Sequence, residues 1–424
     1  MKQEAYCQYI DVLKQELVAA LGCTEPIAIA YASALARAQL GRMPEKITAY
    51  CSGNIIKNVK GVMVPNAGGQ KGVEVAAILG ALGGNPERQL EVLTEITEEQ
   101  IAQSRKLAAQ RICQVQLVEG VANLYVRIEM TAGEDSATVV IADKHTHVVQ
   151  ISKNGEDLLN ESDQSAEEDP GCKRTFMSVD GILDFAESVD LEDVKELLSH
   201  QISCNVAIAE EGLRNSYGAE VGRSILALYG DERVETRAKA YAAAASDARM
   251  SGCDMPVVIN SGSGNQGITV TVPVVQYAQA LGASEEQLYR ALVISNLIAV
   301  HLKTGIGRLS AFCGAVSAAT GSGAAISYLS GASRDQIKMT IANTLGTISG
   351  VVCDGAKASC AAKIASAVEA AIISGKMAAR NKYFPGDEGI LGEDIEQTIR
   401  NIGRLGRDGM AATDVEILKM MIGQ

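Results

Sequence analysis

The sequence predicts an α+β protein: a mostly α-helical domain that carries a smaller, inserted α+β domain. Three observations support this class. Apolar residues recur at helical spacing in residues 1–42 and again in residues 178–424. Between them, residues 43–177 contain runs in which apolar and polar residues alternate, as in strands. The two helical segments share an Ala/Gly-rich composition that the middle segment lacks, so we expect them to form one domain and residues 43–177 another.

The first two helices meet at a short break that contains a cysteine. Apolar spacing predicts a helix over residues 4–19, and Gly22 can end it. Thr24 can cap the next helix, and Pro26 suits its first turn. Cys23 therefore lies at a helix start, where backbone N–H dipoles favour a thiolate. A small buried residue in a tight turn is the alternative interpretation of Cys23.

The inserted segment alternates helices and strands. We expect helices over 71–83 and 98–110, a polar turn over 52–58, and an acidic linker over 154–171. His145 and His147 lie two residues apart on a predicted hairpin; surface positions are expected, with a ligand role as the alternative. The predicted strands are 113–118, 123–131, 136–142 and 146–152.

Composition narrows the function classes. The 424 residues can bury a large core, and 47% hydrophobic with 21% charged residues is typical of a soluble globular protein. A net charge of −13 argues against nucleic acid or anionic membranes as partners. With four Phe and no Trp, the core must depend on close helix contacts. No export signal or 18-residue apolar run is visible, so we expect a cytoplasmic protein with reduced thiols.

Three cysteines of the second helical segment stand among small residues. Cys313 lies in RLSAFCGAVSAATG, and Cys353 and Cys360 lie seven residues apart in VVCDGAKASCAAKIA. Small neighbours leave the thiols as the groups able to bind something bulky close to the backbone. Their spacing matches neither a ferredoxin run nor a zinc ribbon. A metal site and buried inert thiols are both consistent with this pattern.

Polar loops in both domains are candidates for substrate binding. SGNIIKN contains Ser52, Asn54 and Lys57, and the following VPNAGG contains Asn66. These side chains could bind the polar end of a small molecule at a cleft between the domains.

A second group of polar residues lies close to the cysteines in sequence. SGSGNQG, with Ser261 and Asn265, opens a predicted helix and could bind an anion; a tight helix crossing is the alternative. HLKTGIGRLS places Lys303 and Arg308 just before Cys313, where a cation could bind a carboxylate. A solvated or salt-bridged loop is an equally good interpretation of that segment.

Taken together, these blocks resemble the L-cysteine desulfidase family. The blocks are ALGCTEPIAIAYA, SGNIIKN with the later PN, SGSGNQG, HLKTGIGRLSAFCG and CDGAKASCAAKI, and they span nearly the whole chain. That family is iron–sulfur dependent and related to the catalytic chain of bacterial L-serine dehydratases. The resemblance implies that Cys313, Cys353 and Cys360 ligate a [4Fe–4S] cluster in the helical domain and that Cys23 is required for activity.

The resemblance also implies a reaction. It is β-elimination on L-cysteine without pyridoxal phosphate, giving pyruvate, ammonia and sulfide, with the open iron of the cluster as Lewis acid and Cys23 as base. An L-serine dehydratase with the same site is one alternative. A cytoplasmic amino-acid-binding or redox-sensing module is an alternative of another class. The expected partner is a small amino acid, and homo-oligomer formation is left open.

Overall fold

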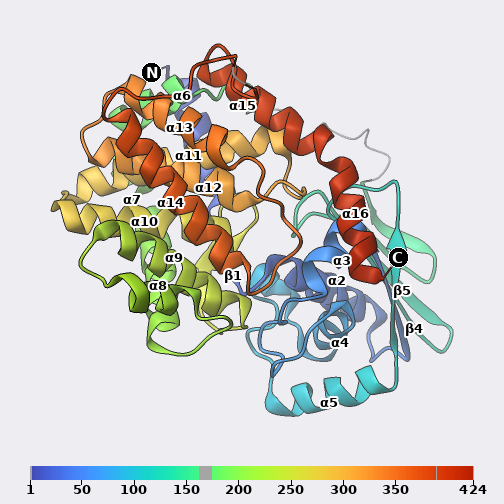
Figure 1. Cartoon of the computed structure of the whole chain (residues 1–424). Helices are drawn as coiled ribbons and strands as arrows, with labels where there is room; N and C mark the ends of the chain where they lie inside the picture. Colours follow the sequence, from blue (N-terminus) through green and yellow to red (C-terminus); the bar gives the residue numbers. More distant parts are fainter. Residues whose placement is uncertain (1, 162–173, 388, 424) are drawn as a thin grey trace.

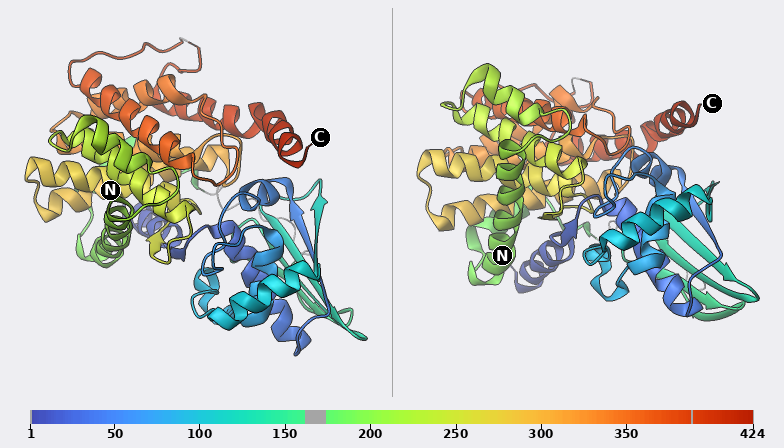
Figure 2. Two further views of the ribbon diagram at one scale, coloured as in Figure 1. Left: turned by 60° about the horizontal axis from the view of Figure 1, so that its bottom comes forward. Right: turned by 90° about the horizontal axis from the view of Figure 1, so that it is seen from below.

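The computed structural model describes residues 2–161, 174–387 and 389–423. It confirms the α+β class: a layered group of helices lies beside a smaller part that contains a six-stranded sheet (Figures 1 and 2). Among the described residues, every helix is too short or too polar to span a bilayer.

The sheet has the order β3-β2-β4-β5-β6-β7. The pair β2–β3 is parallel and the other neighbours are antiparallel. Alternate residues of β4, such as Val126 and Ile128, are fully buried, so one face of the sheet carries the core. Its strands are β2 (Lys46–Ser52), β3 (Cys113–Val118), β4 (Tyr125–Ala132), β5 (Asp135–Ala142), β6 (Val148–Lys153) and β7 (Glu156–Asn160).

Helix α2 packs on this sheet. It contacts β4, β5 and α4, whereas the sequence assigned residues 1–42 to the helical domain. Gly80 of α4 lies so close to α2 that a Cβ would stand 2.2 Å from the carbonyl oxygen of Ala30. We therefore propose that the boundary between the two parts lies at Gly22 rather than at residue 42. This part also holds α2 (Thr24–Leu40), α3 (Gly53–Val59), α4 (Val73–Gly83), η1 (Pro86–Glu91) and α5 (Glu98–Ala109).

Two expectations for the inserted segment were wrong. The polar turn over 52–58 is helix α3, which begins because the Ser52 hydroxyl accepts a hydrogen bond from the backbone N–H of Ile55. The start of the expected linker is strand β7, which extends the sheet by pairing with β6. Residues 162–171 of that linker lie outside the described residues.

The helical part is built from small residues, as its composition predicts. A Cβ on Gly321 of α12 would lie 2.3 Å from the carbonyl oxygen of Ser295 in α11, so these helices approach closely. A two-stranded ladder of β1 (Ala19–Leu21) and β8 (Pro256–Val258) ties the N-terminal segment to this part. Its helices are α1 (Gln3–Glu16), α6 (Val179–Ser188), α7 (Glu192–Arg214), α8 (Val221–Tyr229), α9 (Val234–Met250), α10 (Gly264–Leu281), α11 (Glu285–Ile306), α12 (Gly314–Leu329), α13 (Arg334–Ile348), α14 (Cys360–Ala378), α15 (Ile395–Arg404), the turn η3 (Leu405–Gly409) and α16 (Ala411–Ile422).

Candidate active site

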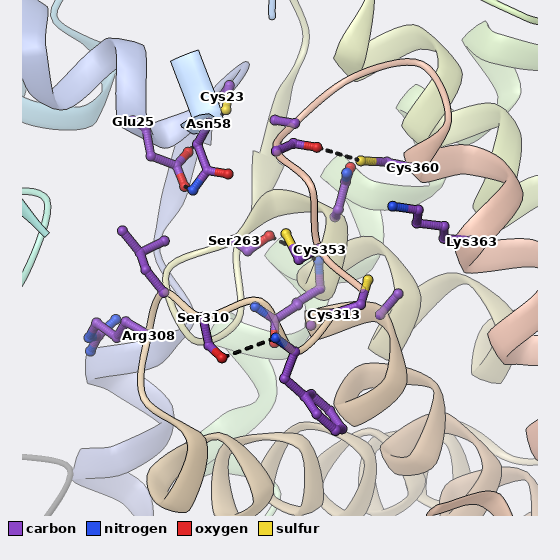
Figure 3. A pocket seen from close by; sticks show the side chains of 18 of the residues that line it. Cys23, Glu25, Asn58, Ser263, Arg308, Ser310, Cys313, Cys353, Cys360 and Lys363 are labelled. Carbon is purple, nitrogen blue, oxygen red and sulfur yellow. Dashed lines mark hydrogen bonds between the residues drawn. The ribbon is translucent and has the colours of Figure 1, made fainter. Parts of the chain in front are cut away.

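A cavity of about 100 Å³ lies where the sheet-bearing part meets the helical part. Its lining includes Cys313, Cys353 and Cys360 from the helical part and Cys23 from the start of α2. Figure 3 shows Cys23 on one side of the opening and the other three cysteines across from it. Four thiols that are far apart in sequence thus line one small space.

Backbone pairing places two of these thiols. Phe312 and Val352 form an isolated antiparallel bridge. On either side of it, the N–H of Cys313 donates to the carbonyl oxygen of Val351 over 3.1 Å, and the N–H of Cys353 donates to that of Ala311 over 2.6 Å. Because side chains alternate along such a ladder, Cys313 and Cys353 project to the same face.

Two of the thiols also stand at helix starts. Cys313 is the residue that precedes α12, and Cys360 is the first residue of α14. Free backbone N–H groups at a helix N-terminus favour negative charge nearby. The ends of α12 and α14 therefore favour an anionic group between them.

Without a bound cation, these thiols resist ionisation. Burial raises the pKa of Cys313 to about 12, helped by the nearby Cys353. Burial also raises the pKa of Cys360. A metal would reverse this, since a coordinating thiol is deprotonated outright.

Three thiols are a donor set that iron–sulfur clusters use. Within the described ranges, no three His, Cys, Asp or Glu side chains are grouped closely enough to hold one metal ion. In a cluster each thiolate binds a different iron, so the sulfur atoms stand further apart than the ligands of one ion. Cys313, Cys353 and Cys360 line one cavity, and two of them lie at helix N-termini.

Two cations, the buried Lys303 and the half-buried Lys363, accompany the thiols. Lys303 lines the cavity; burial lowers its pKa to about 8, while Cys353 and Cys313 act to raise it. Lys363 also lines the cavity and forms an ion pair with Asp354, beside Cys353. These charges suit an anionic group held by the cysteines.

The state of Cys23 differs from the sequence expectation. Its thiol donates a hydrogen bond to Glu25 Oε2 over 3.0 Å. Burial, reinforced by the Glu25 charge, raises the pKa of Cys23 well above its usual value. The helix start does not depress that pKa, because desolvation outweighs the backbone dipoles.

Glu25 is fixed by two further donors. The hydroxyl of Thr24 donates to Oε2 over 3.1 Å, and the side-chain amide of Asn58 in α3 donates to Oε1 over 3.3 Å. Glu25 and Asn58 both line the cavity beside Cys23. Sequence reasoning missed both, although Glu25 follows Cys23 by only two residues.

Of the predicted substrate residues, Asn265 and Lys303 join the thiols in this cavity. Ser52, Asn54 and Lys57 instead line a second cavity of about 410 Å³ beside α16. Lys57 is buried there, forms an ion pair with Asp414 and donates to the carbonyl oxygen of Cys353 over 3.4 Å. It therefore supports the backbone of Cys353 from outside the thiol cavity.

The two remaining predicted residues also lie elsewhere. The Asn66 side chain donates to the carbonyl oxygen of Leu93 over 2.9 Å. The Ser261 hydroxyl donates to Asn260 over 2.9 Å and lines a separate small cavity with Glu16 and Lys303. Neither residue is brought into contact with the thiol cavity.

His145 is not a surface residue. It is 5% exposed, in the β5–β6 turn, where this turn reaches the helical part. Its Cε1 and Nδ1 atoms lie 3.1 and 3.4 Å from the place that a Cβ on Gly262 would take. Burial lowers the pKa of His145 to about 4, against the opposing charge of Glu25. His147, two residues on, is exposed and contacts Glu161, as a surface hairpin predicts.

Several other lining residues were not named from the sequence. Gln266 lies in the first turn of α10, within the SGSGNQG segment. Arg249 lies in the last turn of an Ala-rich helix, α9, and nothing local marks it as functional, since its place at the cavity depends on packing between distant helices. Other lining residues of this kind are Ser263, Ser310 and Ala315.

Comparison with known proteins gives two concordant results. The profile of the serine dehydratase alpha chain family matches residues 87–419. A UPF0597 protein of Lachnoclostridium phytofermentans is 50% identical over 417 residues, covering 98% of this chain and all of that protein. A UPF0597 protein of Desulfitobacterium hafniense is 50% identical, covering 100% of this chain and 98% of that protein. A UPF0597 protein of Treponema denticola is 47% identical, covering 98% of this chain and 97% of that protein.

Proposed function

The chain belongs to the serine dehydratase alpha chain family, and from this premise we propose that it is a lyase acting on L-cysteine. The reaction is β-elimination without pyridoxal phosphate, and its products are pyruvate, ammonia and sulfide. The arrangement of four thiols around one cavity is the observation that carries this proposal.

Cys313, Cys353 and Cys360 would hold a [4Fe–4S] cluster. When bound, such a cluster with one iron free of protein ligands supplies a Lewis acid for the substrate. Reduced thiols and a cluster both need a reducing compartment, which supports a cytoplasmic location.

Cys23 and Glu25 would move the protons. The hydrogen bond from Cys23 to Glu25 gives the thiol proton a defined acceptor. Transfer of that proton to Glu25 leaves a Cys23 thiolate, which can take the α-proton of the substrate as general base. Departure of the β-sulfur as sulfide then gives aminoacrylate. Its imine form reacts with water to give pyruvate and ammonia, without further protein chemistry.

Asn58 and Thr24 would keep Glu25 in position for this step. Both donate to the carboxylate, so they hold the Glu25 side chain beside Cys23. Lys303, on the helical side, would offset negative charge near Cys353 and Cys313.

L-Serine is the second candidate substrate, and the name of the matching family favours it. The same groups would remove the α-proton, and hydroxide would leave in place of sulfide.

The test is turnover by protein purified without oxygen and reconstituted with iron and sulfide. Pyruvate is measured with L-cysteine and with L-serine, and kcat/KM is compared. We expect L-cysteine to be preferred. Faster turnover of L-serine would assign the serine dehydratase reaction. Absence of pyruvate from either amino acid, in protein of full iron content, would contradict a lyase.

A further inference from the structure

Three buried polar atoms of the residues that line the thiol cavity have no hydrogen-bond partner. They are Nε of Arg249, Oδ1 of Asn265 and Oε1 of Gln266. Arg249 is 3% exposed and Gln266 is 4% exposed. Leaving such groups unpaired is costly, so each unpartnered atom indicates what a ligand must provide.

Of the three unpaired groups, the charged guanidinium of Arg249 costs the most free energy to bury. Within the described part of the chain, no hydrogen bond or ion pair joins its guanidinium to another side chain. Two other cations of the lining are paired: Arg308 with Glu16, and Lys363 with Asp354. A buried guanidinium that lines a cavity without a carboxylate partner is suited to bind an anion from solution.

The two amide oxygens require the opposite chemistry. The Nδ2 of Asn265 donates a hydrogen bond to the sulfur of Met250 over 3.6 Å, while its Oδ1 has no partner among the described residues. The Gln266 oxygen is likewise free of donors within the described residues. Carbonyl oxygens accept hydrogen bonds, so the ligand must donate there. The ligand therefore needs an anionic group for Arg249 and a hydrogen-bond donor for the two amide oxygens. A zwitterion carries both.

Two glycines make room for this arrangement. A Cβ on Gly264 would lie 2.3 Å from Nε of Arg249, and a Cβ on Gly314 would lie 2.7 Å from Cδ of Gln266. Any larger residue at these positions would push the side chains away. Gly264 in SGSGNQG and Gly314 in FCG therefore leave the room that the side chains of Arg249 and Gln266 occupy.

Arg249 lines the same cavity as Cys23 and the other three cysteines. Cys23 and Cys360 also belong to one buried apolar contact group with Met250, the residue after Arg249.

We infer that Arg249 binds the α-carboxylate of a small amino acid, and that the amide oxygens of Asn265 and Gln266 accept hydrogen bonds from its α-ammonium group. This site selects zwitterionic α-amino acids and holds the α-carbon near Cys23. The inference deepens the proposed function and rests on it for the fate of the bound molecule. Ser261, which the sequence predicts for this role, makes no such contact.

The experiment separates the two ends of the ligand. L-Alanine has no β leaving group, so its dissociation constant can be measured by calorimetry without turnover. 3-Mercaptopropionate lacks the ammonium group and cysteamine lacks the carboxylate, and both keep the thiol. We expect Arg249→Gln to weaken L-alanine and 3-mercaptopropionate about tenfold or more and to leave cysteamine within twofold. Gln266→Leu should weaken cysteamine and L-alanine but not 3-mercaptopropionate.

Matched controls accompany these variants. Arg237→Gln makes the same change on the same helix, outside the cavity, where Arg237 donates to the carbonyl oxygen of Asp231. It should leave all three affinities unchanged. If Arg249→Gln does not fold by circular dichroism, Arg249→Lys serves instead. That variant keeps the charge but loses the planar fork, and it should weaken 3-mercaptopropionate several-fold.

Three results overturn or separate the claims. Unchanged L-alanine affinity in Arg249→Gln would overturn the inference. So would loss of iron with unchanged affinity, which would assign Arg249 to charge balance at the cysteines. The third result has two parts: L-alanine binds tightly in a way that depends on Arg249, and the wild-type protein makes no pyruvate. It would support the inference and contradict the proposed reaction. That last result would describe an amino-acid-binding module.

Discussion

Cys23 donates its thiol hydrogen to Glu25 Oε2 over 3.0 Å, in a buried pair at the start of α2. Glu25→Gln removes the acceptor for that proton but keeps the size of the side chain. We expect kcat to fall by about a hundredfold to a thousandfold, as on loss of a general acid–base partner, with KM changed by less than about threefold. Steady-state kinetics on the reconstituted variant measures both constants. A rise in KM with kcat unchanged would instead assign Glu25 to substrate binding.

Cys23 itself is predicted to act on the substrate and not on iron. Cys23→Ala should keep the iron content and the visible absorbance of reconstituted protein, and should lose turnover by about a thousandfold or more. Iron and acid-labile sulfide counts are taken beside the pyruvate assay. Loss of iron in this variant would make Cys23 a ligand and remove it as the base.

Cys353 should show the reverse pattern. Cys353→Ala is expected to lose iron and activity together, since the remaining Cys313 and Cys360 leave a cluster short of one ligand. Cys7→Ser is the control: Cys7 is exposed on α1 and does not line the cavity. Full iron binding by Cys353→Ala would remove this residue from the proposed ligand set.

The Lys57–Asp414 pair should stabilise the protein from outside the site. Asp414→Asn leaves the buried Lys57 charge without its partner and is expected to cost about 3 kcal/mol in unfolding free energy. Asp408→Asn breaks an exposed pair with Arg407 and should change the unfolding free energy far less, because water screens both charges. Urea unfolding compares the two. If both variants lost the same unfolding free energy, the burial of Lys57 would not explain the loss in Asp414→Asn.

Stability should fall in acid because of His145. Its pKa is lowered to about 4 in the folded protein by burial, while an ordinary histidine titrates near 6.5. Between these values the unfolded chain binds a proton that the folded chain does not, so unfolding free energy rises with pH across this window. The loss from pH 6.5 to pH 4 amounts to roughly 3 kcal/mol.

His145→Phe should remove that part of the pH dependence. Urea unfolding at several pH values compares it with wild type and with His147→Phe, which changes an exposed histidine of the same hairpin. Burial raises the pKa of Asp247 to about 6, and this gives the opposite slope in every one of these proteins, so it cancels in the comparison. An unchanged slope in His145→Phe would contradict the assignment.

Periodicity and capping residues predicted most of the fold. The helices at 73–83 and 98–109 and the strands at 113–118 and 135–142 lie where the sequence placed them, within a few residues. Short, polar elements were missed: α3 depends on the Ser52 cap, and β7 depends on pairing with β6. The packing of α2 on the sheet was also missed, because a helix that is apolar on most sides can pack on either layer.

The candidate site was predictable where spacing and motif type carried information. The four cysteines were named from the sequence, and the structure places them at one cavity. The raised pKa of Cys23 was not predictable from position, because it depends on burial and on the direction of the Glu25 side chain. Arg249 and His145 were missed because their importance lies in missing partners and in burial between segments distant in sequence.

The ladder that joins Ala311–Cys313 to Val351–Cys353 limits which genetic changes this region can accept. The direction of the two thiols is set by main-chain register, so replacement of Phe312 or Val352 by another apolar residue leaves it intact. Deleting or inserting a single codon in either segment would turn one sulfur to the opposite face. Length variation among homologues should therefore be absent here, even where the side chains differ.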